Sequence, residues 1–200
     1  YGRIRYVAEV VSTKTERLIT VGGPPSYRGC MDPNAVFPVG MAVPTNEDAQ
    51  RVESGAESKF GHLIRITEDA VIGLGERGLM NVTHFRYPQV YGPGQIRPTT
   101  LWWTMQRCLD QRPFVVMPDG GLSLSTRGFA QNMAHAILLA VDNPEASAGQ
   151  IYNCGDDGQF TVAQWVGLIA QEMDWRFEFL NVPDKYANMS RDLMLFRGSS

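Results

Sequence analysis

The segment Phe85-Arg86-Tyr87-Pro88-Gln89-Val90-Tyr91-Gly92-Pro93-Gly94-Gln95 decides the fold that we expect for this 200-residue chain. The residues before it, from Met80 onward, form the apolar run of a strand, and its prolines and glycines end that strand in a turn. Arg86-Tyr87-Pro88-Gln89 therefore stands at the carboxyl end of a strand. In open α/β sheets, ligands bind at this edge.

A strand, helix, strand unit leads up to this turn. Leu18-Ile19-Thr20-Val21 is a short apolar run ended by Gly22-Gly23, and a helical pattern follows between residues 57 and 77. The pattern places Lys59, Leu63, Ile66 and Ala70 at i, i+4, i+7 and i+11, which predicts an inward face headed by Lys59. A right-handed crossover makes the two strands parallel, so both strand ends reach the same edge.

Shorter elements make up the rest of the chain. Residues 1–16 carry Ile4, Val7 and Val11 at helical spacing, whereas residues 24–44 are rich in proline and glycine and predict a long loop, which is usually a functional feature. Further on, we expect a Trp-rich helix to about residue 111, a strand at 114–117, a helix at 131–142, an extended segment at 150–154 and a helix after the capping box Thr161-Val162-Ala163-Gln164. This order predicts an α/β fold in which residues 1–98 form one part and residues 99–200 mainly form a smaller lobe, with some elements of 99–200 returning to the first part.

One glycine motif is misleading. Gly73-Leu74-Gly75-Glu76-Arg77-Gly78 matches G-x-G-x-x-G, but it ends a helix and precedes a strand, whereas a phosphate-binding turn needs the reverse order. We interpret it as a helix C-cap and a tight connection.

Composition narrows the class of partner. A formal charge of -3 and scattered Lys and Arg residues provide no basic surface for nucleic acid, and no apolar run reaches the length of a membrane span. We therefore expect a cytoplasmic protein. Cys30, Cys108 and Cys154 are odd in number and widely spaced, which predicts reduced thiols, and the three histidines lack the spacing of metal ligands, so we expect no metal site.

The strand-end segment resembles that of extended short-chain dehydrogenases/reductases of the nucleotide-sugar epimerase and dehydratase type, in which Arg-x-x-x-Val-Tyr-Gly-Pro-Gly passes beneath the nicotinamide. Ser125-Thr126-Arg127-Gly128-Phe129 is similar to the family's substrate-lobe segment, and Gly149-Gln150-Ile151-Tyr152-Asn153-Cys154-Gly155 to its Tyr-Asn-x-Gly strand. The resemblance implies a Rossmann-type parallel sheet that binds NAD or NADP and a smaller C-terminal α/β lobe that binds a nucleotide sugar or a similar small polar substrate. The family's first strands and Gly-rich turn do not occur in the sequence, and we expect them upstream of Tyr1.

The same resemblance assigns the site residues. Lys59 matches the lysine of the family's Tyr-x-x-x-Lys pair, but Gly55 stands where the tyrosine belongs and Gly23 where the catalytic Ser or Thr belongs. Tyr27 could donate a proton from its loop, although the family uses it chiefly for packing. The predicted catalytic residues are therefore Lys59, from the resemblance, and Tyr27, as a candidate proton donor. The predicted cofactor-binding residues are Gly22, Gly23, Lys59, Tyr87, Pro88 and Val90, and the predicted substrate-binding residues are Gln89 and Arg127.

Each assignment has an alternative. Arg127 could be an ordinary surface arginine, Gln89 a strand-end cap, and Glu57 and His62 solvent-facing residues of the helix. Two functions stay open: an NAD(P)-dependent enzyme with an altered acid/base, or a non-catalytic relative that binds a nucleotide or another ligand. Relatives also pair through two helices, which predicts a homodimer formed by residues 1–16 and 58–77.

Overall fold

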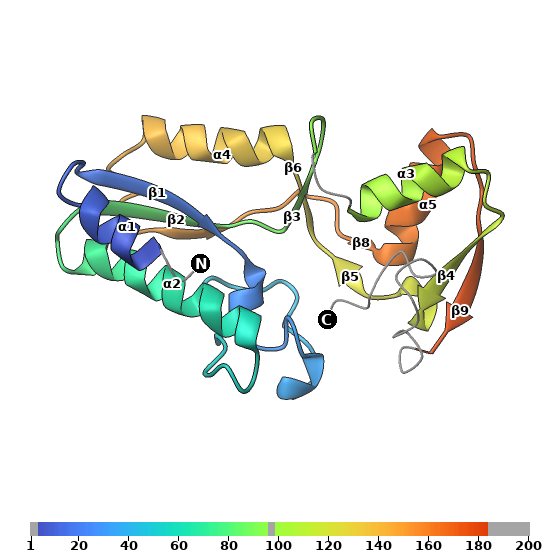
Figure 1. The fold of residues 1–200 in the computed structure, drawn as a ribbon, viewed down its shortest axis with the longest axis horizontal. Coiled ribbons are helices and arrows are strands. Elements are labelled where there is room, and N and C mark those ends of the chain that lie inside the picture. The colour runs from blue at the N-terminus through green and yellow to red at the C-terminus, as the bar shows by residue number, and fades with distance from the viewer. Residues whose placement is uncertain (1–3, 96–98, 184–200) are drawn as a thin grey trace. The chain divides into compact units, whose positions relative to one another are not determined.

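The computed structural model describes residues 4–95 and 99–183, which divide into two compact units (Figure 1). The first unit contains the chain up to Val90 and then Gly128–Gly155. The second contains Tyr91–Arg127 and the chain from Asp156 on. Two of the three crossings fall within the short strands β3 (Gln89–Tyr91) and β6 (Arg127–Phe129), and the third lies between Gly155 and Asp156.

A three-stranded parallel sheet forms the centre of the first unit. Its order is β1 (Arg17–Gly22), β2 (Asn81–Arg86) and β7 (Ile151–Asn153). The register pairs Gly22 with Arg86 and Arg86 with Asn153, so three carboxyl ends meet at one edge. The predicted parallel pairing of the strands near 18–22 and 80–86 is confirmed, and they are joined through a helix that begins at Lys59.

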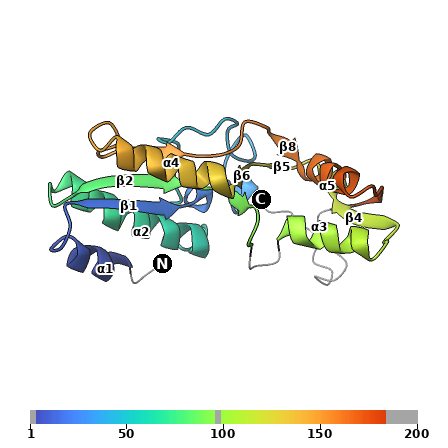
Figure 2. The same ribbon diagram turned by 90° about the horizontal axis from the view of Figure 1, so that it is seen from above.

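Helices cover both faces of this sheet. Figures 1 and 2 show α1 (Ile4–Val11) and α2 (Lys59–Glu76) on one face and α4 (Ala130–Asp142) on the other. Ala8, Val71, Leu74, Met80 and Val82 form the core beneath α1 and α2. Burial of a valine, leucine or methionine side chain stabilises the fold by about 1.5–3 kcal/mol.

The predicted inward face of α2 is wrong. The helix buries Gly61, Ile64, Glu68, Val71, Gly73 and Leu74, whereas Lys59 and Ile66 are exposed. The apolar pattern misled because the true inward face contains a glycine and a charged residue. Helix α1 shows a smaller error: Ile4 and Val11 face the core as expected, but the third inward residue is Ala8, and Val7 is 55% exposed.

Two predicted connections have the expected form. The long loop between β1 and α2 contains only two short 3-10 turns, η1 (Pro24–Ser26) and η2 (Pro33–Ala35), and one isolated bridge between Tyr27 and Arg51. The Gly73 to Gly78 motif ends α2, with the Arg77 amide bonded to the Gly73 carbonyl and Gly78 at φ +68°. The motif is a helix terminus, as predicted.

The second unit packs two helices against short strands. Helices α3 (Thr100–Leu109) and α5 (Val162–Glu172) contact each other. Strand β4 (Phe114–Pro118) pairs in parallel with β9 (Glu178–Val182) and is followed by the 3-10 turn η3 (Asp119–Gly121). Strand β5 (Leu124–Ser125) pairs antiparallel with β8 (Phe160–Thr161). Its core contains Cys108, Val115, Met117, Val166, Ala170 and Phe177. The predicted capping box between Thr161 and Gln164 is present.

Candidate functional site

The carboxyl edge of the parallel sheet gathers several of the predicted cofactor residues. The Tyr87 amide donates to the Gly22 carbonyl at 3.2 Å, which ties the end of β2 to the end of β1. Gly23 follows in an extended conformation, and a Cβ added there would lie 3.3 Å from the Tyr87 carbonyl oxygen. Pro88 and Val90 follow Tyr87 and are half-buried, while Gln89 is exposed. At the end of β1 the edge therefore consists of glycine backbone without side chains, and residues 87–90 lie next to it.

Lys59 is placed near this edge by the start of α2. The helix begins with Ser58, whose hydroxyl accepts the Gly61 amide at 3.1 Å. Gly61 packs directly on η1, because a Cβ there would lie only 2.3 Å from the Pro25 carbonyl oxygen. Since η1 follows Gly23, the first turn of α2 lies beside the loop that leaves β1, and Lys59 in that turn is exposed.

Tyr27 is buried in this region instead of facing solvent. Its side chain is 2% exposed, its hydroxyl donates to Asn153 Oδ1 at 2.9 Å, and Arg86 donates to the same hydroxyl. The Arg86 guanidinium carbon also lies 4.7 Å above the Tyr27 ring. A hydroxyl engaged in this way favours a packing role for Tyr27 over proton donation.

Tyr87 is held by its side chain as well as its backbone. Its hydroxyl donates to the Met133 carbonyl oxygen, on α4. Burial, together with the nearby Cys154, raises the pKa of Tyr87 to about 12. The phenol therefore stays neutral at physiological pH and serves to fix the strand end.

A buried ionic network beneath the edge was missed by sequence reasoning. Glu68 on α2 is 1% exposed and pairs with Arg86 through both carboxylate oxygens, one contact being 3.1 Å from Nε to Oε2. Its carboxylate also lies 3.0 Å from Arg51 Nη1 and 3.4 Å from His84 Nε2. The sequence contained one signal for this network: His84 and Arg86 alternate on one face of a buried strand. A buried arginine requires an acidic partner.

This network fixes the long loop to the sheet edge. Arg86 donates to the Glu47 carbonyl at 2.7 Å, and Asn153 donates from its backbone to the Glu47 carboxylate at 2.9 Å and from its side chain to the Thr45 carbonyl at 2.9 Å. Farther along the loop, Arg28 bonds Glu57 at 2.8 Å. Glu57 is therefore paired with Arg28 instead of simply facing solvent. The loop is held in one position around the site.

Gly22 has a structural reason to be glycine. A Cβ at this position would lie 2.7 Å from His84 Nε2 and 4.0 Å from Glu68 Oε2. His84 in turn lies 2.7 Å from the Thr20 hydroxyl through Nδ1. The glycine thus leaves room for the imidazole that belongs to the buried network.

Acidification is expected to weaken this network. Burial by itself raises the pKa of Glu68, but hydrogen bonds from His84 and Arg86 and their positive charges outweigh burial and lower it to about 2. The pKa of Glu in an unfolded chain is about 4.3, so the unfolded state binds the proton at a higher pH than the folded state does. The contribution of Glu68 to the free energy of unfolding is therefore fully present above about pH 5 and is lost between about pH 5 and pH 2. Urea unfolding at several pH values should show the wild type converging on Glu68→Gln as the pH falls. A constant difference between them would contradict the assignment.

Arg127 belongs to the second unit and is not a surface arginine, because only 3% of it is exposed. Its guanidinium carbon lies 5.1 Å above the Trp165 ring, and Tyr91 packs edge-on against the same ring with centroids 5.0 Å apart. Burial lowers the pKa of Arg127 to about 10, so the guanidinium remains charged at neutral pH. Contact with a substrate phosphate stays a prediction.

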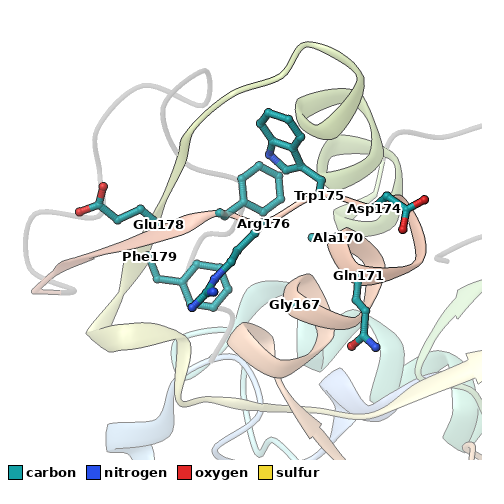
Figure 3. A pocket seen from close by; sticks show the side chains of 9 residues that line it. Gly167, Ala170, Gln171, Asp174, Trp175, Arg176, Glu178 and Phe179 are labelled. Atoms are coloured by element: carbon teal, nitrogen blue, oxygen red, sulfur yellow. The ribbon is translucent and has the colours of Figure 1, made fainter.

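A separate open groove lies on the second unit between α5 and β9 (Figure 3). The groove is lined by Gly167, Ala170, Gln171, Trp175, Arg176 and Phe179. Asp174 and Glu178 lie at opposite ends of the view. None of the predicted site residues lines this groove. Across residues 4–95 and 99–183, no group of His, Cys, Asp and Glu is placed to hold a metal ion, and no helix has the length and apolar character to cross a membrane.

The parallel sheet, with its strand ends at one edge and helices on both faces, defines a Rossmann-type α/β protein. The chain belongs to the NAD dependent epimerase/dehydratase family, whose model matches residues 34–155. A search of the curated proteins found no match.

Solved structures of similar fold include enzymes that act on nucleotide sugars. The UDP-glucuronic acid 4-epimerase of Bacillus cereus, in complex with UDP-glucuronic acid and NAD, superposes with a TM-score of 0.71 at 14% identity over 90% of this chain and 52% of its own. The UDP-glucose 4-epimerase of Thermotoga maritima with UDP-glucose gives 0.70 at 20% identity, over 88% and 54%. The dTDP-glucose 4,6-dehydratase of Bacillus anthracis with NAD gives 0.69 at 15%, over 88% and 53%. The chain spans about half the length of these relatives.

Proposed function

We propose that this protein binds NAD at the carboxyl edge of its parallel sheet and acts on a nucleotide sugar with an altered acid/base. The observation that carries the proposal is the start of α2: its first residue, Lys59, is exposed, and the same turn packs through Gly61 on η1, the segment that follows Gly23. An exposed lysine at the start of a helix that packs near a glycine-terminated strand end fits the nicotinamide ribose, whose hydroxyls accept hydrogen bonds from an ammonium. The nicotinamide would lie against the backbone of Gly23, Tyr87, Pro88 and Val90.

The residues at this edge fit the nicotinamide half of the cofactor. A flat extended backbone at Gly23 lets a planar ring approach closely, and a larger residue would first have to displace the Tyr87 carbonyl, 3.3 Å from a Cβ. Bound NAD would supply hydride chemistry, with its ribose held by Lys59. NAD in the Bacillus cereus and Bacillus anthracis structures supports this choice.

For the substrate we assign Arg127 and Gln89. A guanidinium recognises phosphate oxygens through paired hydrogen bonds, and the charge on Arg127 persists at neutral pH despite its burial. The Gln89 amide is exposed at the end of the first unit and can donate to a sugar hydroxyl. The UDP-sugars in the Bacillus cereus and Thermotoga maritima structures support a nucleotide sugar as the substrate class.

The glycines at positions 23 and 55 favour a second candidate, a non-catalytic binding protein, because neither can carry a proton. One experiment separates the two. The intact protein is mixed with NAD and either UDP-glucuronic acid or UDP-glucose, and the nicotinamide absorbance and the sugar products are followed. An enzyme produces reduced nicotinamide or an altered sugar. Bound NAD with no change in either signal would support the non-catalytic alternative.

We also propose that the protein self-associates through α1 and α2. Tyr6, Val7 and Val10 form an outward apolar stripe on α1, with exposed fractions of 69%, 55% and 64%, and Phe60 and Ile66 are exposed on α2. Val7→Glu with Val10→Glu should convert a dimer to a monomer in light scattering, because charges would be buried in the interface. Val39→Glu, on an exposed loop residue, is the control. A wild-type monomer at high concentration would contradict the proposal.

A further inference from the structure

His62 lies beside the space left by the missing tyrosine. It stands one turn after Lys59 on α2, and a Cβ added at Gly55 would lie 3.7 Å from His62 Cδ2, with no other atom within 4 Å outside the adjoining residues. A side chain at position 55 would therefore extend into open space along the imidazole. The ring borders the volume that a tyrosine at position 55 would fill.

The imidazole is also incompletely satisfied. Nδ1 of His62 is enclosed and has no hydrogen-bond partner within the described residues, although the side chain as a whole is half-buried. An enclosed polar atom without a partner costs free energy, and such atoms call for an explanation, which can be catalytic. The nearest carboxylate in sequence, that of Glu57, accepts a hydrogen bond from Arg28 instead. Imidazole is the side chain suited to proton exchange near neutral pH.

We infer that His62 is the proton-transfer residue that replaces the tyrosine, an inference that rests on the proposed function. Bound oxidised NAD would take up the hydrogen of the sugar's carbinol carbon together with its two electrons. His62 would accept the proton of the hydroxyl group on that carbon, and the carbon would become a ketone. The imidazolium returns this proton when the ketone is reduced again.

Carbethoxylation by diethyl pyrocarbonate, read by peptide mass spectrometry, tests the position of His62 in the intact protein. NAD with UDP-glucuronic acid, each at about ten times its Kd, should slow modification of His62 about tenfold. His135, exposed on α4, is the internal control and should react at an unchanged rate. Gly55→Tyr should slow the reaction at His62 without any ligand, because its ring fills the neighbouring space. Equal rates with and without ligands would overturn the inference.

The His62→Gln variant tests the chemistry. Hydride transfer, measured by nicotinamide absorbance, should fall by about 10²- to 10⁴-fold, the usual contribution of a general acid/base. NAD affinity should stay within about twofold, because the amide retains the polar shape of the ring. A variant that transfers hydride at the wild-type rate would overturn the role. Failure of NAD to bind at all would overturn the proposed function, whereas bound NAD that leaves His62 unprotected would overturn only this inference.

Discussion

Replacing Glu68 with glutamine is expected to destabilise the protein by about 3–5 kcal/mol, the usual effect of removing one partner from a buried ion pair. The change leaves the Arg86 guanidinium, only 2% exposed, without its carboxylate, and it also removes the carboxylate near Arg51 and His84. Urea denaturation followed by circular dichroism measures the effect.

Glu76→Gln is the matched control for this prediction. Glu76 is the last residue of the same helix and is exposed, so its replacement should change the stability by no more than about 0.5 kcal/mol. If Glu68→Gln loses less than about 1 kcal/mol, the network does not hold the sheet edge in the way described here, since a buried charge left without a partner costs several times more.

Gly61→Ala should be destabilising by about 1–3 kcal/mol, the opposite of the usual effect of alanine in a helix. The added methyl group would lie 2.3 Å from the Pro25 carbonyl oxygen and 2.9 Å from Val52 Cγ2, so α2 must move away from η1. That movement also displaces Lys59, and NAD affinity should fall with stability.

Gly167→Ala on α5 provides the matched comparison. No atom lies within 4 Å of a Cβ added there, so the ordinary helix preference for alanine should stabilise the protein by about 0.5–1 kcal/mol. Calorimetric or chemical unfolding of both variants gives the signs. Two shifts of the same sign would contradict the close contact between α2 and η1.

The strand and helix order could be predicted because its signals are local. The apolar runs before Gly22 and Arg86, and the Thr161 to Gln164 capping box, depend on residues close in sequence. The inward face of α2 could not be predicted in this way. Glu68 faces inward because it pairs with Arg86 and His84, which lie on a strand distant in sequence. A charged residue in a helical pattern otherwise indicates a solvent-facing position.

The candidate site shows the same division. Its backbone edge, Gly22-Gly23 with Tyr87, follows from two parallel strands whose order is visible in the sequence. The burial of Tyr27 and Arg127 depends on Asn153 and Trp165, which lie far along the chain, and spacing alone does not reveal such contacts. The sequence predicts a cofactor-binding role for Gly22, and the structure gives a separate reason for its lack of a side chain, the nearby His84 ring.

The most direct test of the central claim is a calorimetric titration of NAD into the intact protein and its Lys59→Met variant. Lys59 should donate a charged hydrogen bond to the ribose, so its loss should weaken binding by about 1.5–3 kcal/mol, or about 10- to 150-fold. Methionine keeps the length of the side chain without the charge, and the residue is exposed, so folding should be unaffected. Equal NAD affinity in the two proteins, or no NAD binding by the wild type, would contradict the account.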